Sequence, residues 1–211
     1  MCSSDLKGVV SLYNNQNYNA TQLGLIQAQW DALENFVGDA NVLPLVDVSG
    51  SMMTPAGKNS KVACLDIAVS LGLYLADKNK GKFKDTFLTF SDSPELLHLK
   101  GNIVQKVQQM VKSTWGMNTN LVRAMEKILK TAKDGNVPQE EMPQMLLILS
   151  DMQFDQCVRF DDSAMEMIRR KFEAAGYDMP NIVFWNLNAA DNVPVKYDTR
   201  GVALVSGFSP A

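Results

Sequence analysis

The chain has 211 residues, of which 46% are hydrophobic and 20% are charged, and its formal net charge is −3. This length allows one sizeable domain with a full hydrophobic core and is short for two. A chain with this small negative net charge shows no excess of basic residues of the kind that binds nucleic acid. Binding of RNA or DNA would therefore need a local basic patch or a further part of the protein.

The three cysteines, Cys2, Cys64 and Cys157, lie far apart and form no CxxC pair. They support neither a zinc site nor a disulfide framework, and they favour a reducing, cytoplasmic setting. The apolar runs, such as 145–149, are far too short to span a bilayer, and the N-terminus carries no basic and then apolar signal sequence. We therefore expect a cytoplasmic protein with no membrane partner.

Residues 1–39 are interpreted as a leader before the main domain at 40–211. The first six residues, MCSSDL, match the end of a sequencing-library adapter when they are read back into codons with a GTG start. This match favours an assembly scar, and a short polar N-terminus is the alternative. Apolar residues at spacings of three and four within 19–36 predict one amphipathic helix that Gly38 would end. These residues are Leu23, Ile26, Trp30 and Leu33.

After the leader, strand-like apolar runs alternate with helical patterns. The expected strands are 42–46, 87–90, 96–99, 145–149, 182–187 and 202–205, and the expected helices are 61–77, 102–111, 120–132 and 163–175. Unalternating runs such as MLLIL and IVFW predict strands that are buried on both faces. The fold class expected is therefore α/β, a doubly wound, Rossmann-like and mostly parallel sheet with helices on both sides.

Two local signals refine this fold. The short link SDSPE between Phe90 and Leu96 predicts a hairpin, and so one antiparallel edge strand. Pro44 lacks an amide donor, which implies that its strand starts pairing at Leu45 or contains a bulge. At the other end, the segment SGFSPA resembles a helix start, so we expect the final helix of the domain to be missing from this sequence.

Oxygen-bearing side chains follow two of the apolar strands. Asp47, Ser49 and Ser51 come directly after the first strand, and Asp151 comes after the run LLILS. Because parallel strands end at the same edge of a sheet, these side chains are expected to meet there, together with Thr119 from the loop STWGMNTN. Two carboxylates and three hydroxyls, with no His or Cys, form an oxygen-only set that suits Mg²⁺ or Mn²⁺.

This pattern resembles the metal-ion-dependent adhesion site of von Willebrand factor A domains. DxSxS at residues 47–51, a Thr in a Gly/Asn loop and an Asp after a later strand occur in the same chain order. The resemblance covers roughly residues 40–211, and the segments FLTFS, LSDMQFD, VFWNL and ALVSGFSP are similar to those of uncharacterised proteins related to the TROVE module of the Ro RNA-binding protein.

The resemblance implies roles for these side chains. Ser49 and Ser51 would contact the metal directly, Thr119 would be a switchable ligand, and Asp47 and Asp151 would act directly or through water. An acidic group of a protein partner would complete the coordination, which makes the chain a non-enzymatic binding module. The TROVE relation implies an alternative, in which this domain is the scaffold of an RNA-binding protein whose binding module lies upstream.

Other readings of the same residues stay open. Asp47 and its neighbours are also common turn formers at strand ends, and a related fold can keep such residues without holding a metal. Methionines near the predicted site would form either a soft rim for a partner or part of the core. They are Met52, Met53, Met117 and Met152. Cys64 lies on the apolar side of a helix and is expected in the core.

Enzymatic alternatives are less well supported. A phosphotransferase of the haloacid dehalogenase type resembles DxDx(T/V), but here Ser49 stands where the acid and base Asp would be. The segment GKNS at 57–60 lacks the spacing of a P-loop. With His98 as the only histidine, no Ser, His and Asp arrangement is credible.

Overall fold

The structure is a computed structural model that describes residues 18–56, 60–114, 116, 120–151, 162–188 and 201–206. Within these residues the strands form one six-stranded sheet in the order β3-β2-β1-β4-β5-β6. All neighbouring strands are parallel except β2 and β3, which pair antiparallel. The strands are β1 (Val42–Val46), β2 (Thr86–Thr89), β3 (Leu96–His98), β4 (Met145–Ser150), β5 (Asn181–Asn186) and β6 (Val202–Ser206). The expected α/β class, its parallel sheet and its antiparallel edge strand are confirmed.

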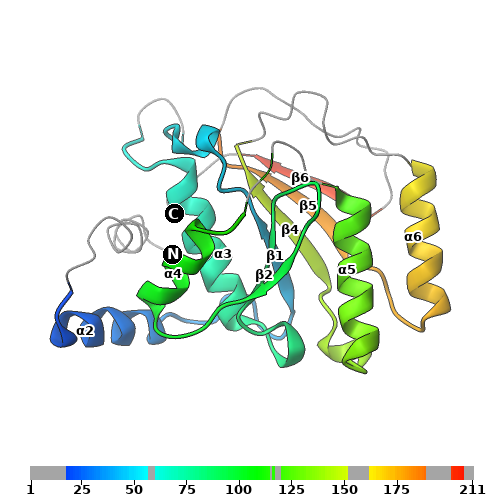
Figure 1. The fold of residues 1–211 in the computed structure, drawn as a ribbon, viewed down its shortest axis with the longest axis horizontal. Helices are drawn as coiled ribbons and strands as arrows, with labels where there is room; N and C mark the ends of the chain where they lie inside the picture. Colours follow the sequence, from blue (N-terminus) through cyan, green and yellow to red (C-terminus); the bar gives the residue numbers. More distant parts are fainter. Residues whose placement is uncertain are drawn as a thin grey trace.

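Helices cover both faces of this sheet (Figure 1). One face packs against α3 (Cys64–Lys78) and α4 (Ile103–Val111), with α2 (Ala20–Asp31) beyond them. The other face packs against α5 (Leu121–Asp134) and α6 (Asp162–Ala174). The connections that the structure describes contain three short 3₁₀ helices, η1 (Gly50–Met53), η2 (Gly81–Phe83) and η3 (Gln139–Glu141).

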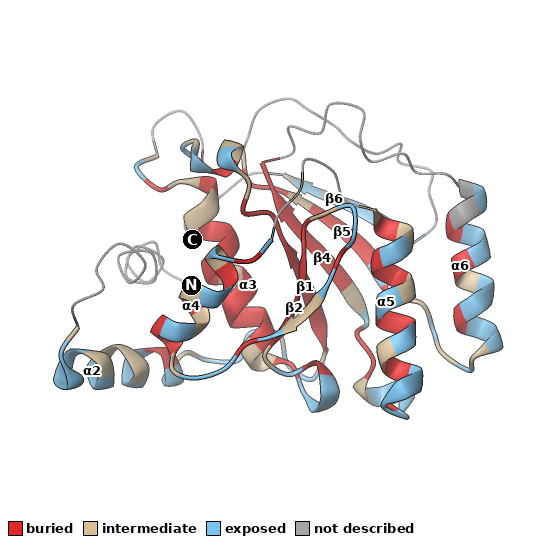
Figure 2. Ribbon diagram, in the orientation of Figure 1, coloured by how far each residue is buried: buried red, intermediate tan, exposed pale blue. Residues whose placement is uncertain are grey.

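The alternation of side chains along the strands divides the core into two parts. Val46 and Leu147 point to the α3 side, whereas Leu45 and Ile148 point to the α5 side. Figure 2 shows that the central strands β1 and β4 are buried except at Met145, the half-buried first residue of β4. Strands covered on both faces have no polar side to expose, which explains the unalternating sequences of β1 and β4. No helix in the described part of the chain is long and apolar enough to cross a membrane.

The leader forms a helix as expected, but the helix ends earlier than predicted. α2 stops at Asp31 with Ala32 as its C-cap, and Gly38, with φ of 68°, makes a separate turn further along. The reason is a contact with α3: the Tyr74 hydroxyl accepts a hydrogen bond from the Phe36 amide and donates one to the Glu34 carbonyl, both at 2.7 Å. These backbone groups are therefore held by a distant side chain rather than by the helix.

Pro44 lies inside β1, and the bulge considered for it is not present. β1 pairs with β4 without interruption from Val42 to Val46, whereas its pairing with β2 begins only at Leu45. The Asp47 amide donates to β4, so alternation along the strand directs Pro44 toward β2. The missing N–H of Pro44 thus falls where the β2 ladder has not yet begun, which is the first of the two expected explanations.

Gly72 lets α3 pack closely on β1. A Cβ at Gly72 would lie 2.6 Å from Val46 Cγ2, inside the buried core. Gly72→Ala is therefore expected to lose about 1–3 kcal/mol through overpacking, partly offset by about 1 kcal/mol of helix propensity. Gly24→Ala in α2, where a Cβ has no neighbour within 4 Å, gains the propensity alone. Urea denaturation should show Gly72→Ala less stable than Gly24→Ala by about 1–3 kcal/mol, and equal stabilities would contradict the close packing.

Candidate metal centre

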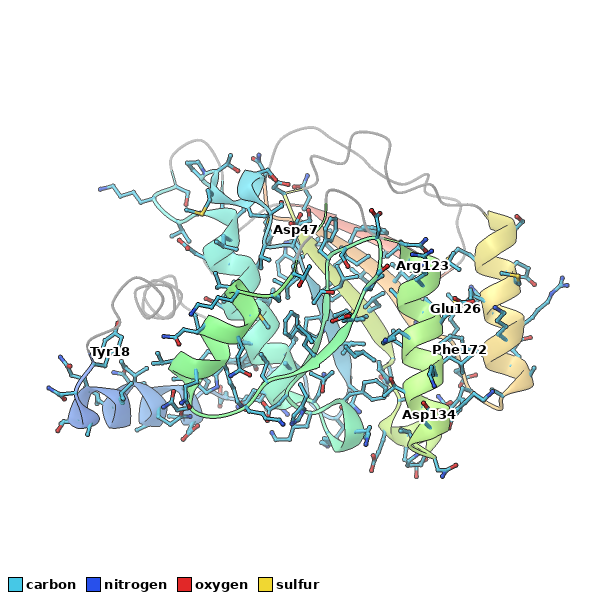
Figure 3. The ribbon with its side chains drawn as sticks, viewed as in Figure 1. Tyr18, Asp47, Arg123, Glu126, Asp134 and Phe172 are labelled. Atoms are coloured by element: carbon cyan, nitrogen blue, oxygen red, sulfur yellow. The ribbon has the colours of Figure 1, made fainter. Side chains whose placement is uncertain are left out.

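The two predicted carboxylates lie at the ends of neighbouring strands. Asp47 follows β1 and Asp151 follows β4, and the Asp47 amide continues the pairing by donating to the Leu149 carbonyl at 3.0 Å. The connections leave β1 and β4 in opposite directions along the sheet, so this is the point where the strand order reverses. Ligands of open α/β sheets bind at the carboxyl ends of the strands at such a point. Figure 3 labels Asp47 near the upper end of the sheet.

The loop after β1 places the two serine hydroxyls side by side. The Ser49 amide donates to Asp47 Oδ1 at 2.9 Å, and Ser49 Oγ lies 3.0 Å from Ser51 Oγ. η1 then begins, with the Met52 amide bonded to the Ser49 carbonyl at 3.1 Å. Both serines are partly exposed, whereas Asp47 is only 3% exposed. The hydroxyls therefore lie nearer to solvent than the carboxylate.

Two further contacts join the loop after β1 to the loop after β4, and the sequence did not predict them. Ser150 Oγ donates to Asp47 Oδ2 at 2.7 Å, and the Asp151 amide donates to the Met52 thioether sulfur at 3.1 Å. Ser150 is 1% exposed and Met52 is fully buried. A buried polar side chain needs a hydrogen-bond partner. The serine at the end of the apolar run in LLILSD is therefore the one sequence signal for a role of Ser150.

The electrostatics of the site disfavour the ionised form of Asp47. Burial raises the pKa of the Asp47 carboxyl above its ordinary value, and hydrogen bonds from Ser49 and Ser150 oppose this shift. The negative charge of Asp151 raises the pKa of Asp47 further, because a like charge disfavours ionisation of a carboxyl. A cation at this place would relieve both the desolvation and the repulsion.

Thr119 lies outside the described residues, so its place relative to the other four side chains stays a prediction. The residues described on either side of it bond to the two residues that directly follow β2, the strand next to β1. The Gly116 amide donates to the Phe90 carbonyl at 2.8 Å, and the Asn120 amide donates to the Ser91 carbonyl at 3.4 Å. Asn120 also caps α5, because its Oδ1 accepts from the Arg123 amide at 3.0 Å.

The methionines near the site divide between core and surface. Met52 is fully buried and Met53 is 67% exposed. Met117 and Met152 lie outside the described residues. Cys64 is fully buried, as expected for a core residue, and burial raises the pKa of its thiol.

The donor set is compatible with a hard cation. Among the described residues there is no group of three or more His, Cys, Asp or Glu side chains that could hold a metal. The arrangement at β1 and β4 instead combines two carboxylates with two neighbouring hydroxyls. Oxygen ligands of this kind fit Mg²⁺ or Mn²⁺ better than zinc. Asp47, Ser49, Ser51 and Asp151 are the described residues that would hold it.

Comparison with known proteins places the chain in a family. The chain is 34% identical over 193 residues to "Uncharacterized protein L728" of Acanthamoeba polyphaga mimivirus, and this match covers 88% of the chain and 32% of the viral protein. The chain thus spans about a third of the length of that relative. Residues 41–211 match the model of a domain of unknown function, DUF7788. The chain therefore belongs to the DUF7788 family.

Proposed function

We propose that the chain is a non-enzymatic binding module that captures an acidic group of a protein partner through Mg²⁺ or Mn²⁺. The residues proposed to hold the ion are Asp47, Ser49, Ser51, Thr119 and Asp151. The observation that supports this proposal is the arrangement at the ends of β1 and β4, where two strand ends carry buried carboxylates and the loop after β1 adds two adjacent hydroxyls of partly exposed serines. The resemblance to the metal-dependent adhesion site of von Willebrand factor A domains provides the same ligand set.

Each of the described residues has a separate task in this proposal. Ser49 and Ser51 present neutral oxygens toward solvent, and the buried Asp47 supplies negative charge from below. Neutral ligands leave much of the positive charge of a bound ion uncompensated. When bound, the ion supplies an open coordination position for a carboxylate oxygen of the partner. Such an arrangement recognises a partner and performs no reaction.

The position of Ser49 is what favours binding over catalysis. An aspartyl phosphotransferase needs a second carboxylate two residues after its nucleophile, and the hydroxyl of Ser49 is a poor general acid or base near neutral pH. His98, the single histidine, lies in the edge strand β3, where its Nδ1 is 3.3 Å from Thr86 Oγ1. It is therefore engaged within the fold at the opposite end of β2 from the proposed site.

The test is calorimetric titration of the full chain with Mg²⁺, comparing the wild type with the double variant Ser49→Ala/Ser51→Ala. The wild type should bind, and Mg²⁺ at about 100 times its Kd should raise the free energy of unfolding by about 2.7 kcal/mol. The double variant removes two partly exposed hydroxyls and no charge, so it should fold normally and lose the response. Ser93→Ala, which removes an exposed hydroxyl of the β2–β3 hairpin, should bind like the wild type.

Capture of a carboxylate is tested with a pair of short peptides that differ only by Glu or Gln at one position. The Glu peptide should bind in Mg²⁺ and be released by EDTA, and the Gln peptide should bind in neither condition. Absence of a Mg²⁺ response in the wild type would refute the metal site. Equal binding of the two peptides would refute capture of an acidic group while leaving the metal site intact.

A further inference from the structure

We propose that Ser150 and Met52 are positioning residues that fix the two carboxylate-bearing loops of the metal site relative to each other. This inference rests on the proposed function, since it concerns residues that support the same site. Ser150 precedes the predicted ligand Asp151 and bonds to Asp47 in the loop after β1. Met52 follows the predicted ligand Ser51 and bonds to Asp151 in the loop after β4. Neither residue is part of the metal-binding motif itself.

Ser150 determines the orientation of the Asp47 carboxylate. Its Oγ donates to Asp47 Oδ2 at 2.7 Å, while the Ser49 amide donates to Asp47 Oδ1 at 2.9 Å. The carboxylate is therefore held by its own loop on one oxygen and by β4 on the other. Each carboxylate oxygen can accept two hydrogen bonds or ligands, so both oxygens keep capacity for a water or a cation.

Met52 forms the second link, in the opposite direction. Its sulfur accepts a hydrogen bond from the Asp151 amide at 3.1 Å, and its own amide donates to the Ser49 carbonyl at 3.1 Å. The main chain of Asp151 is thus connected through one buried side chain to the loop that presents the serine hydroxyls. A thioether is a weak acceptor, so this link is weaker than that of Ser150.

The two links matter because a shared ion needs ligands from both loops at fixed distances. Ligands displaced by about 0.5 Å no longer match the geometry that Mg²⁺ requires. Residues that orient metal ligands typically change metal affinity by about 10–100-fold when they are removed. The full burial of both links keeps water from replacing them.

The experiment compares Ser150→Ala with Ser70→Ala. Both changes delete one buried hydroxyl, but Ser70 Oγ in α3 has no hydrogen-bond partner within the described part of the chain. Titration with Mg²⁺ should show about 10-fold or greater loss of affinity for Ser150→Ala and wild-type affinity for Ser70→Ala. Ser150→Thr retains the hydroxyl and should recover most of the affinity. Met52→Leu, which conserves volume, should weaken binding by a smaller factor.

Urea denaturation in EDTA measures the stability of each variant without metal. A variant that keeps its stability but loses Mg²⁺ affinity has lost the positioning of the site rather than the fold. Wild-type Mg²⁺ affinity in Ser150→Ala, or an equal loss of affinity in Ser70→Ala, would overturn the inference. A third result would also overturn it. In that result Ser150→Ala loses Mg²⁺ affinity and Ser150→Thr does not recover it, although Ser150→Thr is as stable as the wild type. In each of these cases the wild type still binds Mg²⁺, so the proposed function would stand. Failure of the wild type to bind would instead refute the proposed function.

Discussion

Asp47→Asn is expected to abolish Mg²⁺ binding and, at the same time, to stabilise the metal-free protein near neutral pH. The loss of affinity should be about 100-fold or more, because Asp47 is one of the proposed ligands, and removing a group that only orients a ligand already costs up to about 100-fold. The gain in stability has a different origin. The variant removes a buried negative charge that is opposed by desolvation and by the neighbouring charge of Asp151. A merely structural aspartate would not show these two effects together.

The direction of the pH dependence follows from the raised pKa of Asp47. Burial is the largest cause of the shift, so the folded metal-free protein holds this proton more tightly than the unfolded chain does. The associated stability is complete below the ordinary value of 3.8 and is lost as the pH rises through the raised pKa. The wild type should lose this contribution as the pH increases, and Asp47→Asn should not. Their difference in free energy of unfolding should therefore grow with pH.

Urea denaturation in EDTA between about pH 4 and pH 8 measures this difference. The same denaturation with Mg²⁺ in place of EDTA shows whether each protein is stabilised by the metal. The two m-values should agree, so that stabilities rather than denatured states are compared. Asp77→Asn is the control, because Asp77 lies near the C-terminal end of α3 among Lys78, Lys84 and Lys106. It should keep the Mg²⁺ response. Parallel pH curves for the wild type and Asp47→Asn would contradict the electrostatic account of the site.

Local sequence signals predicted the elements of the fold because strands and helices here follow their hydrophobic patterns closely. The run at 42–46 became β1 with the expected bounds, and the short link after Phe90 became the antiparallel hairpin. Even the Pro44 conflict was resolved by one of the two explanations that chain chemistry allows. These features depend on residues a few positions apart, where pattern and geometry are tightly coupled.

The remaining features depend on contacts between distant residues, which pattern alone does not specify. The sequence predicted that Asp47 and Asp151 lie at the same edge of the sheet, because the carboxyl ends of parallel strands meet there. It did not show that Ser150 bonds to Asp47 across 103 positions, or that Tyr74 ends the leader helix early. Such partners are decided by the register between strands and by the packing of helices.

Asn79→Ala is expected to cause a large loss of stability, because Asn79 acts as the missing strand partner of Val42. Its Oδ1 accepts from the Val42 amide at 2.8 Å, and its Nδ2 donates to the Val42 carbonyl at 3.0 Å. Val42 precedes the point where β1 begins to pair with β2, and both residues are buried. The variant leaves two buried backbone groups without partners, each costing about 1–3 kcal/mol.

The comparison that isolates burial is Asn35→Ala, because Asn35 makes the same two kinds of bond on the surface. Its Oδ1 accepts from the Val37 amide at 3.0 Å and its Nδ2 donates to the Gly38 carbonyl at 2.8 Å, both exposed. Water can replace these bonds, so Asn35→Ala should cost less than about 1 kcal/mol. Asn79→Ala should cost about 2–6 kcal/mol and lower Tm by about 4–24 °C. Equal losses in the two variants would mean that water reaches the start of β1, and that Asn79 does not replace a strand there.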